Sequence, residues 1–162
     1  MKLSITHLAP YLPYGLKWKF DGEDLTHDVV GLDITNRGVK LVSPYNDYGD
    51  CEISSGKPIL LPMSSLYTEM EDGKVPAIEL AKIANPKTTW TLQPDCNFPL
   101  SNIGELFAWT IDENEFYFHL EWKDYSKHYF NQLGCFQYLF ENHFDVFGLI
   151  DKGLAIDKTK IK

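Results

Sequence analysis

The sequence is short of arginine, and this shortage restricts the partners that can be expected. Arg37 is the only arginine among 162 residues, and 23 Asp and Glu against 15 Lys and Arg give a formal net charge of −8. Nucleic-acid binding normally leaves a basic footprint, because neutralising phosphates supplies much of the affinity. The composition therefore argues against nucleic acid as the principal partner.

Cysteine is also scarce. Cys51, Cys96 and Cys135 are widely separated, and no Cys-x-x-Cys pair is present. An odd, dispersed set fits neither a disulfide framework nor a zinc ribbon. We expect these thiols to be buried as small apolar side chains in a reducing cytoplasm, and we expect no metal or other cofactor.

The chain has no long hydrophobic run. No stretch approaches the roughly 18 apolar residues of a membrane-spanning helix, so no membrane association is expected. The short apolar start is interrupted by His7, Pro10 and Pro13, which does not fit a signal peptide. A hydrophobic content of 44% and an aromatic content of 14% are nevertheless enough for a core and argue against intrinsic disorder.

Residues 1–62 have the pattern of a small antiparallel β-barrel-like unit. Pro10 and Pro13 predict a turn or an extended lead-in over 8–16 instead of a helix. Leu16, Trp18 and Phe20 then alternate with lysines, as in a half-buried strand. Further short strands are expected at 25–34, 39–42 and 59–61 and near Ile53.

Residues 63–162 predict a mixed α/β half that ends in an amphipathic helix. Short helices are expected over 64–71 and 76–84, and alternating aromatic residues predict a hairpin with arms at 107–111 and 116–122. From Asn131 the period becomes helical, with Gly153 as a plausible C-terminal cap. The apolar stripe of this helix comprises Leu133, Phe136, Phe140, His143 and Phe147. The predicted class is α+β, and the two parts may be separate domains or share one core.

The residues that could ligate a metal or act as nucleophiles are dispersed. His119, His128, Cys135 and His143 are seven to nine positions apart, whereas metal ligands usually include pairs two to five apart. Packing is the expected role of Cys135 and His143, although the sequence does not show whether these four residues converge. A Gly-x-Ser-x-Gly motif is missing, and Ser54-Ser55-Gly56-Lys57 is only a fragment of a phosphate loop. We therefore predict neither catalytic residues nor a metal site.

Tyrosines are the residue type that most favours a binding role. Of the 23 aromatic residues, 14 fall between Phe107 and Phe147, where alternation and helical spacing assign most of them to a core. Tyr45, Tyr48, Tyr125 and Tyr129 lie in expected loops and are candidate contacts with a protein partner, because tyrosine is enriched at interfaces. The plainer interpretation is that these four are amphipathic surface residues.

Two terminal motifs resemble a known group of proteins. Residues 8–17, LAPYLPYGLK, and residues 143–157, HFDVFGLIDKGLAID, together resemble a family of short uncharacterised proteins in Bacteroidetes genomes, many from phages, prophages or other mobile elements. The likeness extends over both ends and the region 62–86, and leaves 88–130 unplaced. It implies a phage-linked gene and a bacterial cytoplasm, and it transfers no activity.

These observations lead to three hypotheses. The first is a non-enzymatic phage or mobile-element accessory protein that binds a host or phage protein. Residues 63–157 hold fifteen acids and six lysines, so its acidic face would compete for a basic, nucleic-acid-binding site on the target protein. The alternative is a nucleic-acid-associated module in the N-terminal unit. Its contacts would be Lys17, Lys19, Arg37 and Lys40. The third is an enzyme with a dispersed site.

Overall fold

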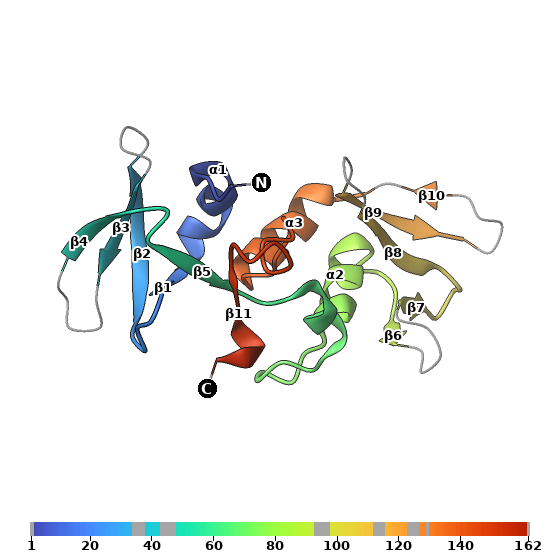
Figure 1. Ribbon diagram of the computed structural model, residues 1–162. Helices are drawn as coiled ribbons and strands as arrows, with labels where there is room; N and C mark the ends of the chain where they lie inside the picture. Colours follow the sequence, from blue (N-terminus) through green and yellow to red (C-terminus); the bar gives the residue numbers. More distant parts are fainter. Residues whose placement is uncertain are drawn as a thin grey trace. The chain divides into compact units, whose positions relative to one another are not determined.

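The computed structural model describes residues 2–33, 38–42, 48–92, 98–111, 116–122, 127–128 and 130–161. It confirms the α+β class, with helices and two sheets (Figure 1). The chain divides into two compact units: unit 1 comprises Met1–Met63 and Leu139–Lys162, and unit 2 comprises Ser64–Tyr138. The division after Met63 lies next to the predicted one, but residues 139–162 return to the N-terminal unit.

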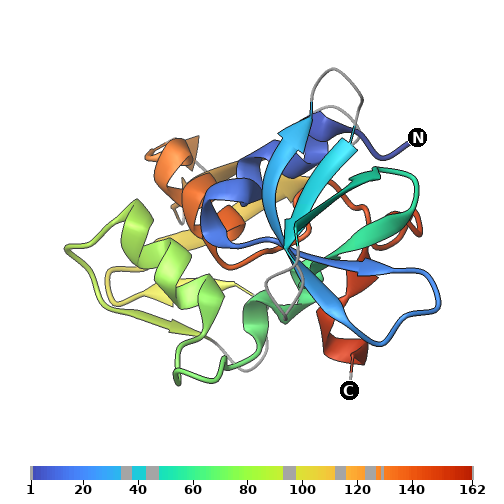
Figure 2. The same ribbon diagram turned by 90° about the vertical axis from the view of Figure 1, so that its left-hand side faces the viewer.

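Unit 1 contains a six-stranded sheet in the order β11-β5-β1-β2-β3-β4 (Figure 2). The neighbouring pairs β5–β1, β1–β2, β2–β3 and β3–β4 are antiparallel, and β11 runs parallel to β5. This order has two ends, so the described strands form no closed barrel, and the expected barrel-like closure is not confirmed. The strands are β1 (Lys17–Phe20), β2 (Thr26–Asp33), β3 (Gly38–Val42), β4 (Tyr48–Glu52), β5 (Gly56–Leu60) and β11 (Ile156–Asp157).

The proline-rich start is helical, contrary to the expected turn or extended lead-in. A short helix α1 (Ile5–Leu8) continues into a 3₁₀ helix, η1 (Ala9–Tyr14). Pro10 lies in the first turn of η1, where a backbone N–H has no helical acceptor and its loss costs little. Gly15, at a φ of +74°, ends η1 in the left-handed conformation that glycine adopts without strain.

The two terminal motifs meet in the core of unit 1. The buried Tyr11 hydroxyl donates to the Phe144 carbonyl at 2.7 Å and accepts from the Val146 N–H at 3.3 Å. Its ring contacts Phe140 edge-on, with centroids 5.0 Å apart. Burial raises the pKa of Tyr11, so this hydroxyl stays protonated and donates. The motifs thus pack together although about 130 residues separate them.

Unit 2 contains an antiparallel sheet in the order β10-β9-β8-β7-β6. Phe107 faces Leu120 and Trp109 faces Phe118, which confirms the predicted hairpin. The helix expected over 64–71 is a shorter 3₁₀ helix, η2 (Met63–Tyr67). The other elements are α2 (Pro76–Ala84), β6 (Trp90–Leu92), β7 (Pro99–Ser101), β8 (Leu106–Ile111), β9 (Phe116–Glu121), β10 (Lys127–His128) and α3 (Gln132–Glu141).

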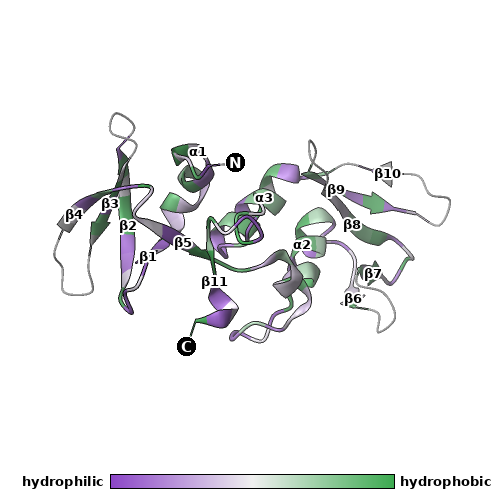
Figure 3. Cartoon of the chain, viewed as in Figure 1, coloured by the Kyte–Doolittle hydropathy of each residue, from purple (hydrophilic) through white to green (hydrophobic). Residues whose placement is uncertain are grey.

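The predicted helix from Asn131 to Gly153 is too long. Helix α3 ends at Glu141, because the His143 N–H bonds to the Phe140 carbonyl and the Phe144 N–H to the Leu139 carbonyl. This is a Schellman motif with His143 at a φ of +59°. Turns, β11 and the hydrophilic 3₁₀ helix η3 (Lys158–Lys160) follow (Figure 3). Leu133, assigned to the inward stripe, is 68% exposed.

Candidate functional site

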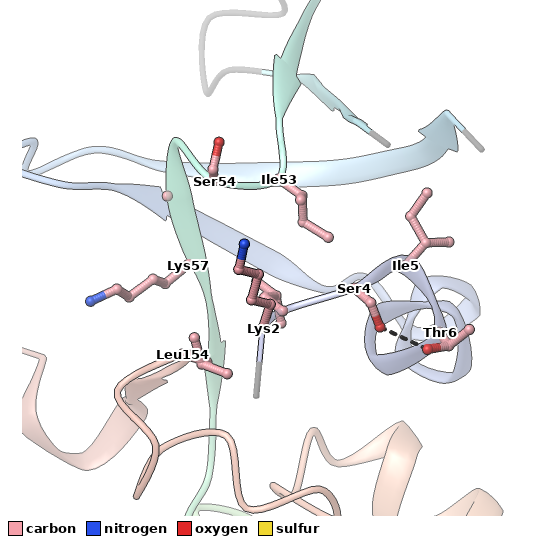
Figure 4. Close-up of a pocket in the computed structure, with 10 residues that line it drawn as sticks. Lys2, Ser4, Ile5, Thr6, Ile53, Ser54, Lys57 and Leu154 are labelled. Carbon is pink, nitrogen blue, oxygen red and sulfur yellow. Dashed lines mark hydrogen bonds between the residues drawn. The ribbon is translucent and has the colours of Figure 1, made fainter. Parts of the chain in front are cut away.

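Unit 1 carries a groove of about 770 Å³ formed by three separate segments. One side is the start of the chain, Lys2–Thr6, and another is the turn between β4 and β5 together with the start of β5. Leu154 completes it, lying on one side of the groove with Ile5 on the other (Figure 4). We call this feature the unit 1 groove.

The wall of the unit 1 groove is mainly aliphatic. Leu3, Ile5, Ile53 and Leu154 supply its apolar side chains. Leu3, Ile53 and Leu154 are half-buried and pack against the core of unit 1. The groove is therefore a continuation of the core toward solvent, and its residues are held by packing on their inner sides.

The charged side chains of the unit 1 groove are both lysines. Lys2 and Lys57 line it, and none of the carboxylates that the structure describes does. Neither lysine forms an ion pair with any residue that the structure describes, unlike Lys17, which pairs with Asp28. The groove is thus a positively charged, apolar surface in a chain whose net charge is −8.

A Ser–His pair at the unit 1 groove has a structural explanation. Ser4 Oγ lies 2.9 Å from Nδ1 of His7, and the Ser4 backbone N–H donates to the same Nδ1 at 3.0 Å. Burial, together with the charge of Lys152, lowers the pKa of His7, so the ring is neutral and Nδ1 accepts. This is a capping box at the start of α1. Since the Nδ1 lone pair already holds a backbone N–H, the pair does not form a nucleophile and base.

A buried donor lies beside the unit 1 groove. The Trp18 side chain is fully buried, and its Nε1 has no hydrogen-bond partner among the described residues. A Cβ added to Gly56, a residue of the groove wall, would lie 2.5 Å from this Nε1. The indole therefore occupies the space that a side chain at position 56 would need. The sequence carries no signal for this arrangement, because it depends on the pairing of β1 with β5.

Unit 2 carries a second, smaller concavity of about 580 Å³, which we call the Trp122 hollow. It is lined by the turn between β7 and β8, parts of those strands, and the end of β9. Ile103 and Trp122 are exposed by 52% and 38%. Glu121 is the charged residue of its lining, with its carboxylate 3.6 Å from Nε2 of His119. The hollow is thus apolar and slightly acidic.

Most of the tyrosines predicted as partner contacts lie outside the described residues. This applies to Tyr45, Tyr125 and Tyr129, and Tyr48 is described only as the first residue of β4. Their role stays a prediction. Trp122 and Ile103 were not among the predicted contacts; Trp122 is the last residue of the hairpin arm expected over 116–122.

Three of the four basic residues proposed for nucleic acid share a sheet face. Lys17 and Lys19 alternate with the buried Trp18, and Lys40 alternates with the buried Val39 and Leu41. Acidic residues lie among them, since Lys17 pairs with Asp28 and Lys40 lies opposite Asp50. The face is therefore mixed in charge. Arg37 lies outside the described residues.

The dispersed histidines and Cys135 occupy different elements. His119 is buried in β9, His128 is exposed in β10, and His143 follows α3. Burial raises the pKa of Cys135 to about 12, which keeps the thiol protonated and unreactive. Within the described ranges, no three His, Cys, Asp or Glu side chains are grouped so as to hold a metal ion.

Comparison with known proteins adds no relative. No family model matches the chain, and neither a curated protein nor a solved structure is similar to it. Among the helices that the structure describes, none combines the length and apolar character needed to cross a membrane.

Proposed function

We propose that the protein acts by binding another protein, without catalysis, and that the Trp122 hollow is part of its contact surface. The observation that carries this proposal is the exposure of Ile103 and Trp122 at one concavity. Together with the terminal motifs, it favours an accessory protein of a phage or other mobile element that acts on a host or phage protein in the bacterial cytoplasm.

An exposed tryptophan in a hollow is the kind of residue that dominates protein interfaces. A few side chains usually carry most of the binding energy, and tryptophan is enriched among them. Trp122 combines a large apolar ring with an N–H that can donate at a wet rim. The edge-on contact of its ring with His128, at 6.4 Å between centroids, restricts its orientation before a partner binds.

The charge of unit 2 indicates what kind of partner fits. Residues 64–138 contain eleven acidic and five basic side chains, a net of −6, whereas the rest of the chain has a net of −2. Complementary charge speeds association and selects among partners. The expected counterpart is a basic surface on the partner protein, such as a surface with which that partner binds nucleic acid.

The test is capture of partners from host lysate by the tagged full chain, with and without nuclease. We expect one stoichiometric, nuclease-resistant protein that Trp122→Ala fails to retain. The matched control is Leu133→Ala, which removes a more exposed apolar side chain of unit 2 outside the hollow. Equal capture by both variants, or recovery only while nucleic acid is intact, would contradict the proposal.

The alternative function is a nucleic-acid-associated module in the N-terminal strands. It is supported by the common sheet face of Lys17, Lys19 and Lys40. Oligonucleotide binding with a steep salt dependence, abolished when these lysines and Arg37 are replaced by glutamate, would favour it. Binding that survives these four substitutions would exclude this surface.

A further inference from the structure

We propose that the unit 1 groove binds a small monoanionic amphiphile, of which an unbranched alkyl carboxylate is the simplest. The alkyl chain would lie along the aliphatic wall and the anionic head at Lys2, while Lys57, whose ammonium points away from the other lining residues in Figure 4, would add positive charge at longer range. This site belongs to unit 1 and does not depend on the protein partner proposed for unit 2.

The size and lining of the groove suit a flexible chain. Its volume of about 770 Å³ lies within the roughly 300–1,000 Å³ that small-molecule sites span. Its apolar side chains are those of leucine and isoleucine, and no aromatic ring within the described ranges lines it. A planar ligand usually finds a stacking ring, whereas an alkyl chain needs only aliphatic contact. The wall therefore favours an aliphatic ligand.

The charge of the groove selects an anion. Among the described residues, its two lysines have no ion-pair partner and no carboxylate lines the groove to compete with a ligand. A lysine ammonium is a compact point charge that pairs with a single anionic group. A single anionic head group fits this lining.

The strand that forms one wall argues against an extended peptide as the occupant. Peptides that bind at sheets usually add a strand and pair their backbone with the edge. Pro58 in β5 lacks an N–H and faces Trp18 across the β1–β5 pair. Strand β5 already pairs with β1 on one side and, at Ile59 and Leu60, with β11 on the other, which leaves little free edge, and Pro58 has no N–H to offer an added strand.

The test is calorimetric titration of the full chain with three ligands that share a ten-carbon chain. These are decanoate, below its micelle concentration, decanol and decyltrimethylammonium. We expect one decanoate to bind per chain, at least tenfold more tightly than the cationic amphiphile. Equal affinity for the anionic and cationic heads would overturn the proposal, as would no decanoate binding at all.

Charge-reversal variants locate the head group. The double variant Lys2→Glu/Lys57→Glu should weaken decanoate binding about tenfold, because it removes two positive charges from the groove lining and adds two negative ones that repel the carboxylate. The control, Lys40→Glu/Lys160→Glu, changes the net charge equally on unit 1 residues outside the groove and should bind as the parent does. Thermal melting confirms that both variants fold.

Comparison of the two double variants separates a head-group site in the groove from an effect of overall charge. Equal weakening by both double variants would assign the effect to overall charge and overturn the site. Sedimentation adds a further outcome. If the parent self-associates, the double variant Lys2→Glu/Lys57→Glu does not, and decanoate does not bind, the groove would be assigned to a second copy of the chain. This result would also overturn the proposal.

Discussion

At the scale of single residues, the contact between Trp18 and Gly56 explains why one position of β5 has no side chain. A Cβ at residue 56 would lie 2.5 Å from Trp18 Nε1 and 2.6 Å from the Lys19 carbonyl oxygen. Real Cβ atoms do not approach so closely, and the oxygen belongs to the backbone of the neighbouring strand. Gly56 thus permits both the pairing of β5 with β1 and the burial of the indole.

Gly56→Ala is expected to destabilise the protein by about 1–3 kcal/mol, the usual cost of overpacking a fixed site. Gly49→Ala in β4 is the matched control, since nothing lies within 4 Å of its added Cβ, and its effect should stay within about 0.5 kcal/mol. Urea unfolding measures both values. Equal stability of the two variants would show that the indole and strand β1 shift freely.

At the scale of elements, long-range pairing fixes the path of the chain that follows α3. The Leu61 N–H donates to the His143 carbonyl, and the Asp145 N–H donates to the Leu61 carbonyl, both at 2.8 Å. Residues after Glu141 therefore pair with the chain that follows β5. The apolar positions at 143 and 147 continue the helical period in the sequence, but they pack on Tyr11 from a non-helical backbone.

Substitutions at His143 test this helix end. Asparagine tolerates a positive φ, whereas a β-branched residue does not, so His143→Val should be less stable than His143→Asn by about 1–2 kcal/mol. Thermal unfolding of the two variants measures the difference. If valine were as stable as asparagine, the Schellman motif would not be what ends α3.

Elements with a strong local period could be predicted from the sequence. The hairpin of β8 and β9 follows from alternation across Phe107 and Trp109, and α2 follows from Pro76 at its start and Pro86 after its end. The 3₁₀ helix η1 was missed because Pro10 and Pro13 exclude an α-helix interior but fit a tighter helix with few required donors.

At the scale of the whole molecule, Tyr11 joins the two ends of the chain within unit 1. Its hydroxyl bonds to the backbone at Phe144 and Val146, and Asp145 between them accepts the N–H groups of Leu149 and Ile150 at 2.8 and 2.7 Å. The sequence showed both motifs but not their contact, because nothing local relates positions more than 130 residues apart. For this reason the return of 139–162 to unit 1 was not predicted.

Tyr11→Phe should cost about 0.5–1.5 kcal/mol, since it removes the hydroxyl's bonds to the Phe144 carbonyl and the Val146 N–H, which keep only their bond to each other. Tyr14→Phe is the control, because the Tyr14 hydroxyl bonds to no described residue, and it should be nearly neutral. Urea unfolding is again the measurement. A neutral Tyr11→Phe would mean that ring packing alone joins the two ends.

The candidate surfaces were also beyond prediction. The unit 1 groove gathers residues 2–6, 53–57 and 154, and the Trp122 hollow gathers a turn after β7 and the end of β9. Neither set has a spacing that a motif search detects. The charge distribution along the sequence did indicate that the two surfaces differ in charge: the lysines lie mainly toward the two ends of the chain, and the middle is acidic.

The central claim is that Trp122 and Ile103 carry the binding of a protein partner. The most direct test is the affinity of the purified captured partner for Trp122→Ala and Leu133→Ala by calorimetry. The account predicts a loss of about 2 kcal/mol or more, roughly 30-fold, for Trp122→Ala, and less than threefold for Leu133→Ala. Unchanged affinity of Trp122→Ala, with the fold intact, would contradict it.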